Sequence, residues 1–536
     1  MEPRMPFDDV AWEKSDNIAR SWIRKVLEDD SLIALGHKVA KHRGGKPIEV
    51  QTPPAGSFNV IIATVFEDGG KALIRLAKPA VSMFPEEKTR LEVATMRFVQ
   101  AQTTIPVPLI LEWGTKEESP CDLGPFIIME WVENDMDLCD ALKDPNLPEG
   151  NRPVLDPAIP DEKLRKIYRQ LAGILVQLSR PSAERIGAIS QVGDEWEVDQ
   201  RPLTFGMAEL VQLGTVPRSK APSGTFSSST SYFRFLADLL LEHLVHQRND
   251  AVKGEDDCRR KYVARQLFRK LAREDRLAWK TKPPFRLWSD DFRPANVLVS
   301  KDLAVSGVID WEWMYFAPPE FSHSPPWWLL IEMPEYWQEG LEDWADNYEK
   351  RLETFLEELK TVENEFISHS QLEEGNYLSD RMRKCWDDGD FWVFYALRKS
   401  FAFDAIFWHK ICPRFFGFGV EEWEKGVELL GDELKDMEEV VEKKVKEMET
   451  RELAWDYDGP DFETLNKKEK KEEEEEEEEE KEEENSTVSR TEFDALRKEH
   501  DALKQEHELL KARVDRLFTH LGLEQDQDEQ SKTAEG

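Results

Sequence analysis

The segment Trp288–Val299, which reads WSDDFRPANVLV, constrains the fold of this chain more than any other. Asp291 and Asn296 are separated by four residues, and an apolar run follows directly. A second apolar run, Val305–Ile309, comes after a turn-like tetrapeptide and ends at Asp310. The pattern therefore predicts a short hairpin that holds Asp310 at a fixed distance from the loop that contains Asp291 and Asn296.

Phosphoryl transfer of the kinase type needs three such groups around the reacting phosphate. One carboxylate accepts or orients the proton of the acceptor hydroxyl, an amide from the same loop ligates a metal, and a carboxylate on the next hairpin holds the metal that bridges the phosphates. Asp291, Asn296 and Asp310 have this spacing. The Asp-x4-Asn pair is a weak signal by itself, and the hairpin with its terminal Asp makes it a strong one. A turn-forming Asp291 is the alternative.

The stretch resembles the H-G-D-x-x-x-x-N plus I-D-W-E pattern of aminoglycoside phosphotransferase-like kinases, and its Trp-rich form resembles their large fungal branch. The resemblance covers roughly residues 50–410. It implies an α+β, two-lobed protein-kinase-like fold with a small β-rich N-lobe and a large helical C-lobe. It also implies that Asp291 is the catalytic base, that Asn296 and Asp310 ligate Mg²⁺, and that ATP is the phosphate donor. Asp290 falls at the family's Gly position, which argues against it as the base.

The first lobe contains candidate nucleotide contacts. By resemblance, the segment before Val60 would cover the phosphates, although an ordinary hairpin turn fits it equally well. Arg75 stands where the family usually has Lys, and Arg can also pair with phosphates. Glu92 suits an ion pair with Arg75; Glu86 and Glu87 are competitors, and a surface Glu is the alternative for each. The predicted nucleotide-binding residues are Gly56, Ser57, Asn59, Arg75, Glu92, Glu130 and Val132.

The catalytic loop departs from the family pattern at one position. Ser289 replaces a His that is thought to brace the loop through hydrogen bonds without reacting. Ser289 and Arg293 are therefore predicted to support the loop. The loss of the His could loosen the geometry of the loop without abolishing the chemistry.

Composition divides the chain into further segments. We predict a helical N-terminal extension at 1–45, the N-lobe at 46–135, the helical C-lobe at 136–455, an acidic linker at 456–488, a coiled-coil helix at 489–523 and a disordered tail at 524–536. A capping-box sequence starts the coiled-coil segment, and apolar residues then recur at alternating spacings of three and four. A homodimer through 489–523 is the simplest interpretation, and a single amphipathic helix that docks on the body is the alternative.

The formal net charge of −37 argues against general binding to nucleic acids or anionic membranes. The most apolar stretch, Phe391–Trp408, is interrupted by Arg398, Lys399 and Asp404, so we expect a buried amphipathic helix there and no membrane span. Five scattered cysteines without CxxC spacing predict reduced thiols, and the N-terminus lacks the apolar stretch of a signal peptide. Together these features predict a cytoplasmic protein.

The sequence thus predicts an ATP- and Mg²⁺-dependent phosphotransferase that transfers the γ-phosphate to a hydroxyl of a small molecule. The acidic charge favours a cationic acceptor, such as an amino sugar or an amino alcohol. The alternative is a pseudokinase, a nucleotide-binding or scaffolding module that dimerises through its coiled coil, and Ser289 and Arg75 favour it. The presence of Asp291, Asn296 and Asp310 favours the enzyme, because degenerate kinases usually lose the base or a metal ligand.

Overall fold

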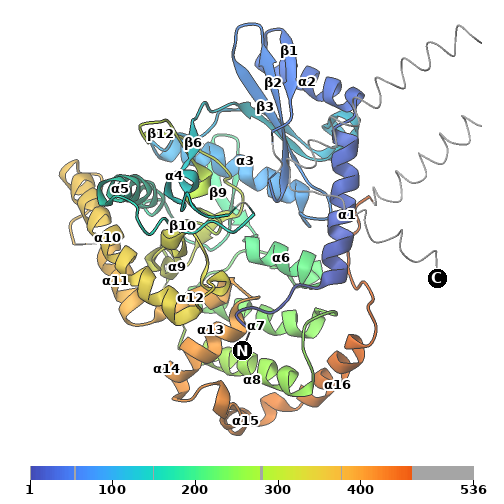
Figure 1. Cartoon of the computed structure of the whole chain (residues 1–536), viewed down its shortest axis with the longest axis vertical. Helices are drawn as coiled ribbons and strands as arrows, with labels where there is room; N and C mark the ends of the chain where they lie inside the picture. Colours follow the sequence, from blue (N-terminus) through green and yellow to red (C-terminus); the bar gives the residue numbers. More distant parts are fainter. Residues whose placement is uncertain (1, 54–55, 149, 278–281, 376, 461–536) are drawn as a thin grey trace, which may run out of the picture.

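The computed structural model describes residues 2–53, 56–148, 150–277, 282–375 and 377–460. These residues form two lobes, with a β-rich N-lobe at the top of Figure 1 and a larger helical C-lobe below it. The arrangement is the α+β, two-lobed, protein-kinase-like fold that the sequence predicts.

The N-lobe is built on a five-stranded antiparallel sheet in the order β1-β2-β3-β5-β4. Its strands are β1 (Pro47–Gln51), β2 (Asn59–Phe66), β3 (Lys71–Ala77), β4 (Ile110–Gly114) and β5 (Phe126–Glu130). Helix α3 (Pro85–Gln102) packs against this sheet, and its Leu91 lies in the same apolar cluster as Ile127 of β5. Because side chains alternate between the faces of a strand, Arg75 of β3 points away from Ile74, which packs on the other side of the sheet.

The C-lobe contains most of the helices and three small antiparallel sheets. Its longer helices are α5 (Asp161–Leu178), α6 (Phe205–Leu213), α7 (Ser229–His246), α8 (Glu255–Arg273), α10 (Leu341–Ser368), α11 (Leu378–Asp387), α12 (Asp390–Arg398) and α16 (Met437–Met448). Its shorter ones are α4 (Leu138–Leu142), α9 (Pro319–His323), α13 (Phe403–Ile406), α14 (Cys412–Phe416) and α15 (Glu424–Leu430).

The strands of the C-lobe frame the predicted catalytic loop. They are β6 (Met136–Asp137), β7 (Ser182–Ala183), β8 (Ala188–Val192), β9 (Glu195–Gln200), β10 (Phe285–Ser289), β11 (Val297–Val299), β12 (Val305–Val308) and β13 (Met314–Ala317). Strand β10 leads into the loop, and β11 pairs with β12 in the hairpin that the sequence predicts. The loop is therefore held between two strands, one on each side.

The apolar stretch 391–408 is buried as predicted, but it does not form one helix. Helix α12 ends at Arg398, and α13 begins only at Phe403. At the break, Arg398 and Lys399 are both buried, Arg398 beside Asp290 and Lys399 against the cavity. In the part of the chain that the structure describes, no helix is long and apolar enough to cross a membrane.

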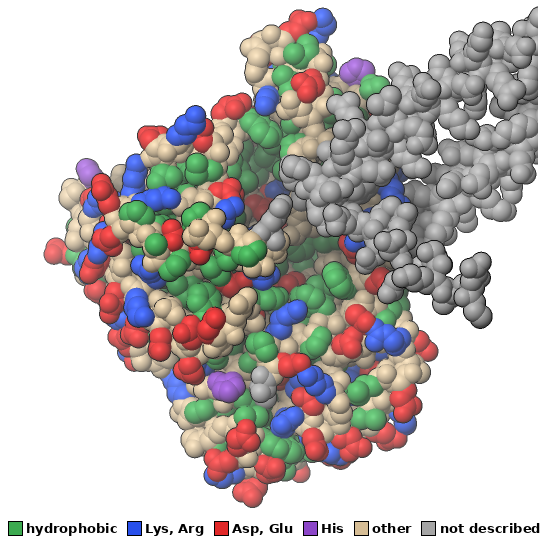
Figure 2. Space-filling view, viewed as in Figure 1, with side chains coloured by type: hydrophobic (Ala, Val, Ile, Leu, Met, Phe, Trp, Pro, Cys, Tyr) green, Lys and Arg blue, Asp and Glu red, His purple; other side chains and the backbone are tan. Residues whose placement is uncertain are grey.

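Figure 2 shows acidic and basic side chains interspersed over the C-lobe face in view.

Helix α1 (Asp9–Val26) connects the two lobes and stands upright at the right of Figure 1. Together with α2 (Asp29–Arg43), its C-terminal half packs on the outer face of the N-lobe sheet, and the buried Trp22 donates from Nε1 to the carbonyl of Leu123 at 2.7 Å. Its middle contacts the C-lobe, since Gln212 of α6 donates to Ser15 Oγ at 2.7 Å. The predicted N-terminal extension is therefore helical and part of the folded body.

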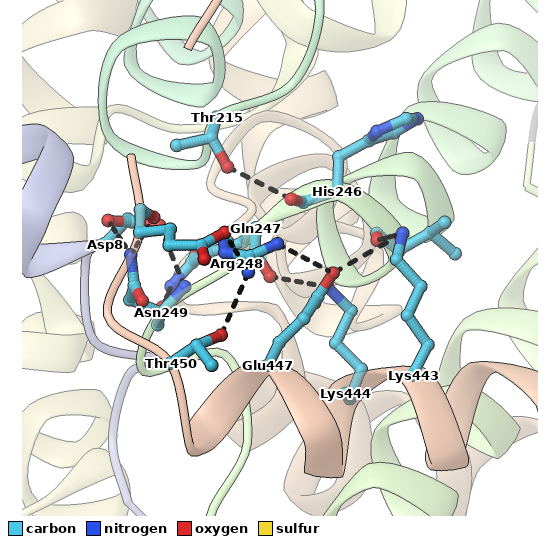
Figure 3. A network of polar contacts seen from close by, with 12 residues as sticks. Asp8, Thr215, His246, Gln247, Arg248, Asn249, Lys443, Lys444, Glu447 and Thr450 are labelled. Carbon is cyan, nitrogen blue, oxygen red and sulfur yellow. Dashed lines mark hydrogen bonds and ion pairs between the residues drawn. The ribbon is translucent and has the colours of Figure 1, made fainter. Parts of the chain in front are cut away.

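The start of α1 is fixed by a polar network that also includes α16 (Figure 3). Asp8 accepts from the backbone N–H of Ala11 at 3.0 Å and from the side chain of Asn249 at 2.9 Å. Gln247 donates to the carbonyl of Pro6, and Lys444 of α16 donates to the carbonyl of Gln247 at 2.6 Å. The N-terminal segment, the end of α7 and α16 are thus joined by direct hydrogen bonds.

The first residues of the predicted acidic linker lie on the body. Arg218 donates to the carboxylate of Asp458 at 2.7 Å, and Trp455 and Tyr457 pack against the apolar cluster of α1, α2 and the N-lobe sheet. This ion pair and these rings attach the first residues of the predicted linker to the folded body. The rest of the linker, the predicted coiled coil at 489–523 and the tail lie outside the described residues.

Candidate active site

The predicted catalytic loop is closed by hydrogen bonds between its own ends. Asn296 lies at the end of a short 3-10 turn, and its side-chain Nδ2 donates to the carbonyl of Asp291 at 2.9 Å. The backbone N–H of Ile309, at the end of β12, donates to the carbonyl of Asn296 at 2.9 Å. The two bonds set the position of the loop relative to the hairpin, so that Asp291, Asn296 and Asp310 lie around one region.

Asp310 adopts a left-handed backbone conformation with φ of 62°. Its Oδ1 accepts from Nη1 of Arg75 at 3.2 Å, and the other end of that guanidinium forms an ion pair with Glu92. The predicted pair of Arg75 with Glu92 is thus present, and neither Glu86 nor Glu87 replaces it. Burial and the neighbouring Glu312 raise the pKa of Asp310, and Arg75 opposes that shift.

Asp291 is the carboxylate of the loop that faces the cleft, and its side chain is 14% exposed. Burial raises its pKa to about 7, with the cation of Arg293 opposing the shift and Asp310 adding to it. Nε of Arg293 lies 3.7 Å from Oδ1 of Asp291. Arg293, which the sequence predicts as a support of the loop, therefore faces the carboxylate that it was expected to position.

The adjacent Asp290 is not available to a substrate. Its carboxylate is buried behind the loop, with Oδ1 3.7 Å from Nη1 of Arg398. The guanidinium of Arg398 lies 5.0 Å from the ring centroid of Trp288. Asp290 and Arg398 thus lie behind the loop, while Ser289 pairs through its backbone with Met314 of β13.

A second buried group, which the sequence did not reveal, lies beside Asp310. Glu312 accepts from Lys88 and from Nδ2 of Asn59, the latter at 3.2 Å, and Lys88 also donates to Oδ1 of Asn59 at 3.0 Å. Burial by itself would raise the pKa of Glu312, but Lys88 and Arg75 hold it below its usual value. The side chain of Asn59, predicted to meet the nucleotide, is used inside the protein. The only signal in the sequence for the role of Glu312 was its position as the Glu of the I-D-W-E motif.

Glu130 and Val132, which the sequence predicts as nucleotide-binding residues, lie at and just beyond the end of β5. The side chain of Glu130 is exposed, and its backbone N–H donates to the carbonyl of Leu109 at 3.0 Å. Val132 packs against Gly307 of β12, where a Cβ would come within 2.8 Å of Val132 Cγ1. Gly307 is therefore required for the close approach of this segment to the hairpin.

A cavity of about 660 Å³ lies beside Asp291 and Asp310, and the predicted site residues Arg75, Glu92, Asn296, Glu130 and Val132 are not among its lining residues. It is lined by the predicted loop residues Gly56 and Ser57, by Asp291, Arg293 and Asp310, and by residues of α1 and α6. Its charged residues are Arg20, Lys78, Arg152, Arg293, Lys399, Asp16, Glu209, Asp291, Asp310 and Glu312. The overall acidity of the chain is therefore not repeated in the cavity, where basic and acidic residues are equal in number.

Oxygen atoms of Asn296 and Asp310 fit a magnesium ion. Because Asn296 uses its Nδ2 for the bond to Asp291, its Oδ1 is the atom left for a ligand. Mg²⁺ commonly takes one or two protein oxygens and completes its shell with phosphates and water. No cluster of three or more His, Cys, Asp or Glu suited to a metal occurs among the described residues. The two oxygen ligands of Asn296 and Asp310 thus agree with a metal ion that is held jointly by the protein and by phosphates.

A family model described as Phosphotransferase enzyme family matches residues 63–356. No curated protein matches the sequence. Among solved structures, a putative fructosamine-3-kinase from Thermobifida fusca is 13% identical and aligns over 77% of this chain and 99% of its own, with a TM-score of 0.33. An ethanolamine kinase from Plasmodium vivax is 12% identical over 80% of this chain and 89% of its own, with a TM-score of 0.35. A macrolide 2'-phosphotransferase from Brachybacterium faecium is 13% identical and aligns over 70% of this chain and 96% of its own, with a TM-score of 0.35.

Proposed function

Because the chain belongs to the phosphotransferase enzyme family, we propose that it is an ATP- and Mg²⁺-dependent kinase that transfers the γ-phosphate to a hydroxyl of a small molecule. The observation that carries this proposal is the convergence of Asp291, Asn296 and Asp310 beside one cavity. These are the groups on which kinases without a P-loop depend.

In the proposed reaction, Asp291 accepts the proton of the acceptor hydroxyl as its oxygen forms a bond to the γ-phosphorus. The bond from that phosphorus to the bridging oxygen breaks, and ADP leaves with the electron pair. Asn296 and Asp310 would hold Mg²⁺, which when bound neutralises charge on the phosphates. Arg75, fixed between Glu92 and Asp310, keeps Asp310 in place and presents a cation toward the phosphates.

The identity of the acceptor is a separate proposal. A cationic acceptor would need a carboxylate in the cavity beyond those of the reaction, and Glu209 of α6 is one. Burial raises the pKa of Glu209 to about 7, and Lys399 opposes the shift. Glu209 is then partly ionised at neutral pH and suited to an amine. We also propose a cytoplasmic location and a homodimer through residues 489–523.

The test uses the full chain and an Asp291→Asn variant. Nucleotide binding is measured by calorimetry with and without Mg²⁺, and ATP consumption is followed over a panel of hydroxylated metabolites. We expect Mg²⁺-dependent binding in both proteins, and turnover about 100- to 10,000-fold lower in the variant, because a general base contributes that much. Asp302→Asn, an exposed carboxylate on the β11–β12 turn, is the matched control and should retain turnover.

Two results would contradict the proposal in different ways. The absence of any Mg²⁺-dependent nucleotide binding would exclude the enzyme. Binding in the wild type with no turnover beyond that of Asp291→Asn would instead favour a nucleotide-binding scaffold.

A further inference from the structure

Two lysines in the cavity lack the partners that other buried lysines have. Lys88, Lys261 and Lys444 are buried, and each forms an ion pair, with Glu312, Asp257 and Glu447 respectively. Lys399 is equally buried, at 8% exposure, and the half-buried Lys78 lines the same cavity. Among the residues that the structure describes, neither Lys78 nor Lys399 has a carboxylate within ion-pair distance.

An ammonium group that leaves water without a partner costs several kcal/mol, so buried cations normally have one. Burial lowers the pKa of Lys78 to about 8, and Asp16 opposes the shift. The side chain of Lys78 is therefore still mostly protonated at neutral pH. The charge of Lys399 acts on Asp291 and Glu209. Both cations therefore face the cavity, where an anionic ligand would compensate them.

The two lysines come from opposite lobes. Lys78 directly follows β3, and its backbone N–H donates to the carbonyl of Phe58 at 2.9 Å, which places it beside the loop of Gly56 and Ser57. Lys399 follows the last residue of α12, with Nζ 4.7 Å from the ring centroid of Phe205. Cations on both sides of the cleft are suited to an anion that lies between the lobes.

The remaining cations of the cleft are already engaged. Arg75 is held by both Glu92 and Asp310, and Arg293 faces Asp291. Charge that develops on the transferred phosphoryl group needs further stabilisation, because most of the rate gain in phosphoryl transfer comes from positioning and electrostatics. Within the cavity, Lys78 and Lys399 are the lysines that remain for it.

We propose that Lys78 and Lys399 contact the γ-phosphoryl group of the bound nucleotide from the two sides of the cleft. The proposal rests on the proposed kinase function and adds two residues to it, one of which lies outside the matched range 63–356. Neither lysine takes part in the proton transfer: the phosphoryl group passes from ADP to the acceptor oxygen, and the proton of the acceptor goes to Asp291.

The experiment compares Mg-AMP-PNP with Mg-ADP, which differ by the γ-phosphoryl group. Dissociation constants are measured by calorimetry for the full chain, Lys78→Met, Lys399→Met and the conservative Lys→Arg variants. A hydrogen bond to a charged group is worth about 1.5–3 kcal/mol, so each Met variant should lose about tenfold or more of its affinity for Mg-AMP-PNP. The affinity for Mg-ADP should change by less than about twofold. The Lys→Arg variants should keep part of the affinity for Mg-AMP-PNP that the Met variants lose.

Lys301→Met is the matched control, because Lys301 is exposed on the β11–β12 turn, and it should alter neither constant. Thermal unfolding checks that each variant folds, and Lys→Gln replaces Met where a variant does not. Unchanged Mg-AMP-PNP affinity, or an equal loss for both nucleotides, would overturn the role of the lysines while leaving the kinase intact. A wild-type protein that binds neither nucleotide would overturn the kinase proposal together with it.

Discussion

The two walls of the cleft are built differently. One wall consists of the catalytic loop, the β11–β12 hairpin and the pair of Arg75 with Glu92, all within the matched range 63–356. The other wall consists of α1, which lies before that range, and Lys399, which lies after it. In the first wall the catalytic loop is closed locally by the bond from Asn296 to Asp291, and Arg75 pairs with the distant Asp310. The second wall is anchored by bonds between distant residues, such as that of Asn249 with Asp8.

The difference indicates which wall carries the chemistry and which one adapts it. The catalytic loop is closed by an internal bond, so part of its geometry is set locally, while Arg75 and Arg398 hold Asp310 and Asp290 from other segments. A wall assembled from distant segments depends on tertiary packing, and its residues can differ without changing the reaction. We therefore expect substitutions in the first wall to affect turnover and substitutions in the second to affect stability and ligand selection.

The largest effect should come from Asp310→Asn in the first wall. The change removes one of the two proposed protein ligands for Mg²⁺ together with the partner of Arg75. It should lower turnover about 1000-fold or more, because transition-state charge stabilisation of this kind is worth that much. Steady-state ATP consumption at several Mg²⁺ concentrations measures it. Turnover that stays near the wild-type value would place the metal elsewhere.

A smaller effect, now on stability, is expected from Arg398→Met. The change leaves the carboxylate of Asp290 buried without its cation and should lower the free energy of unfolding by about 3 kcal/mol. Urea unfolding measures it, and the double variant with Asp290→Asn should recover much of the loss. If the double variant is no more stable than the single one, the pair does not couple the loop to α12.

The third effect depends on pH and concerns the network that anchors α1. Burial lowers the pKa of His243 to about 3, and Arg265 adds to the shift, whereas the unfolded chain has the ordinary value of 6.5. The unfolded state therefore binds the proton first, so stability is full above about pH 6.5 and falls as the pH drops toward 3.

The expected loss is about 1.4 kcal/mol per pH unit in this window. Urea unfolding at several pH values should show a steeper decline for the wild type than for His243→Asn, which can retain the contact with Gln247. Parallel pH profiles for the two proteins would contradict the assignment to His243.

The smallest effect should come from an exposed ion pair on α1 that lines the second wall. Arg20 and Asp16 of α1 form an i,i+4 pair at 2.8 Å, and both side chains are more than one-third exposed. Such pairs contribute about 0.5 kcal/mol or less, so Arg20→Gln should leave the unfolding midpoint nearly unchanged. A large loss of stability would show that this face of α1 is a structural contact and not a lining of the cavity.

The first wall could be predicted from the sequence because its signals are local. The spacing of Asp291 and Asn296, the hairpin and Asp310 follow one another within a short segment, and the structure brings them together. The ion pair of Arg75 with Glu92 could be inferred because a strand is followed by a helix in the expected order.

The second wall could not be predicted, because no local pattern states where a helix docks. The charges that interrupt the apolar stretch, Arg398, Lys399 and Asp404, were visible in the sequence but indicated only that the segment does not span a membrane. The structure gives each a separate use: Arg398 pairs with Asp290, Lys399 lines the cavity, and Asp404 pairs with Arg265. Two of these three charges thus have buried partners, and the identity of each partner required the fold.

The course of α1 has a mechanical consequence. In kinases, substrate entry and product release accompany rotation of one lobe against the other, and such motions often limit turnover. A helix that is bonded to α6 through Ser15 and to the N-lobe through Trp22 resists this rotation. Release of ADP would then require these contacts to slide or separate, so the dwell time of the product depends on a segment remote from the reacting atoms.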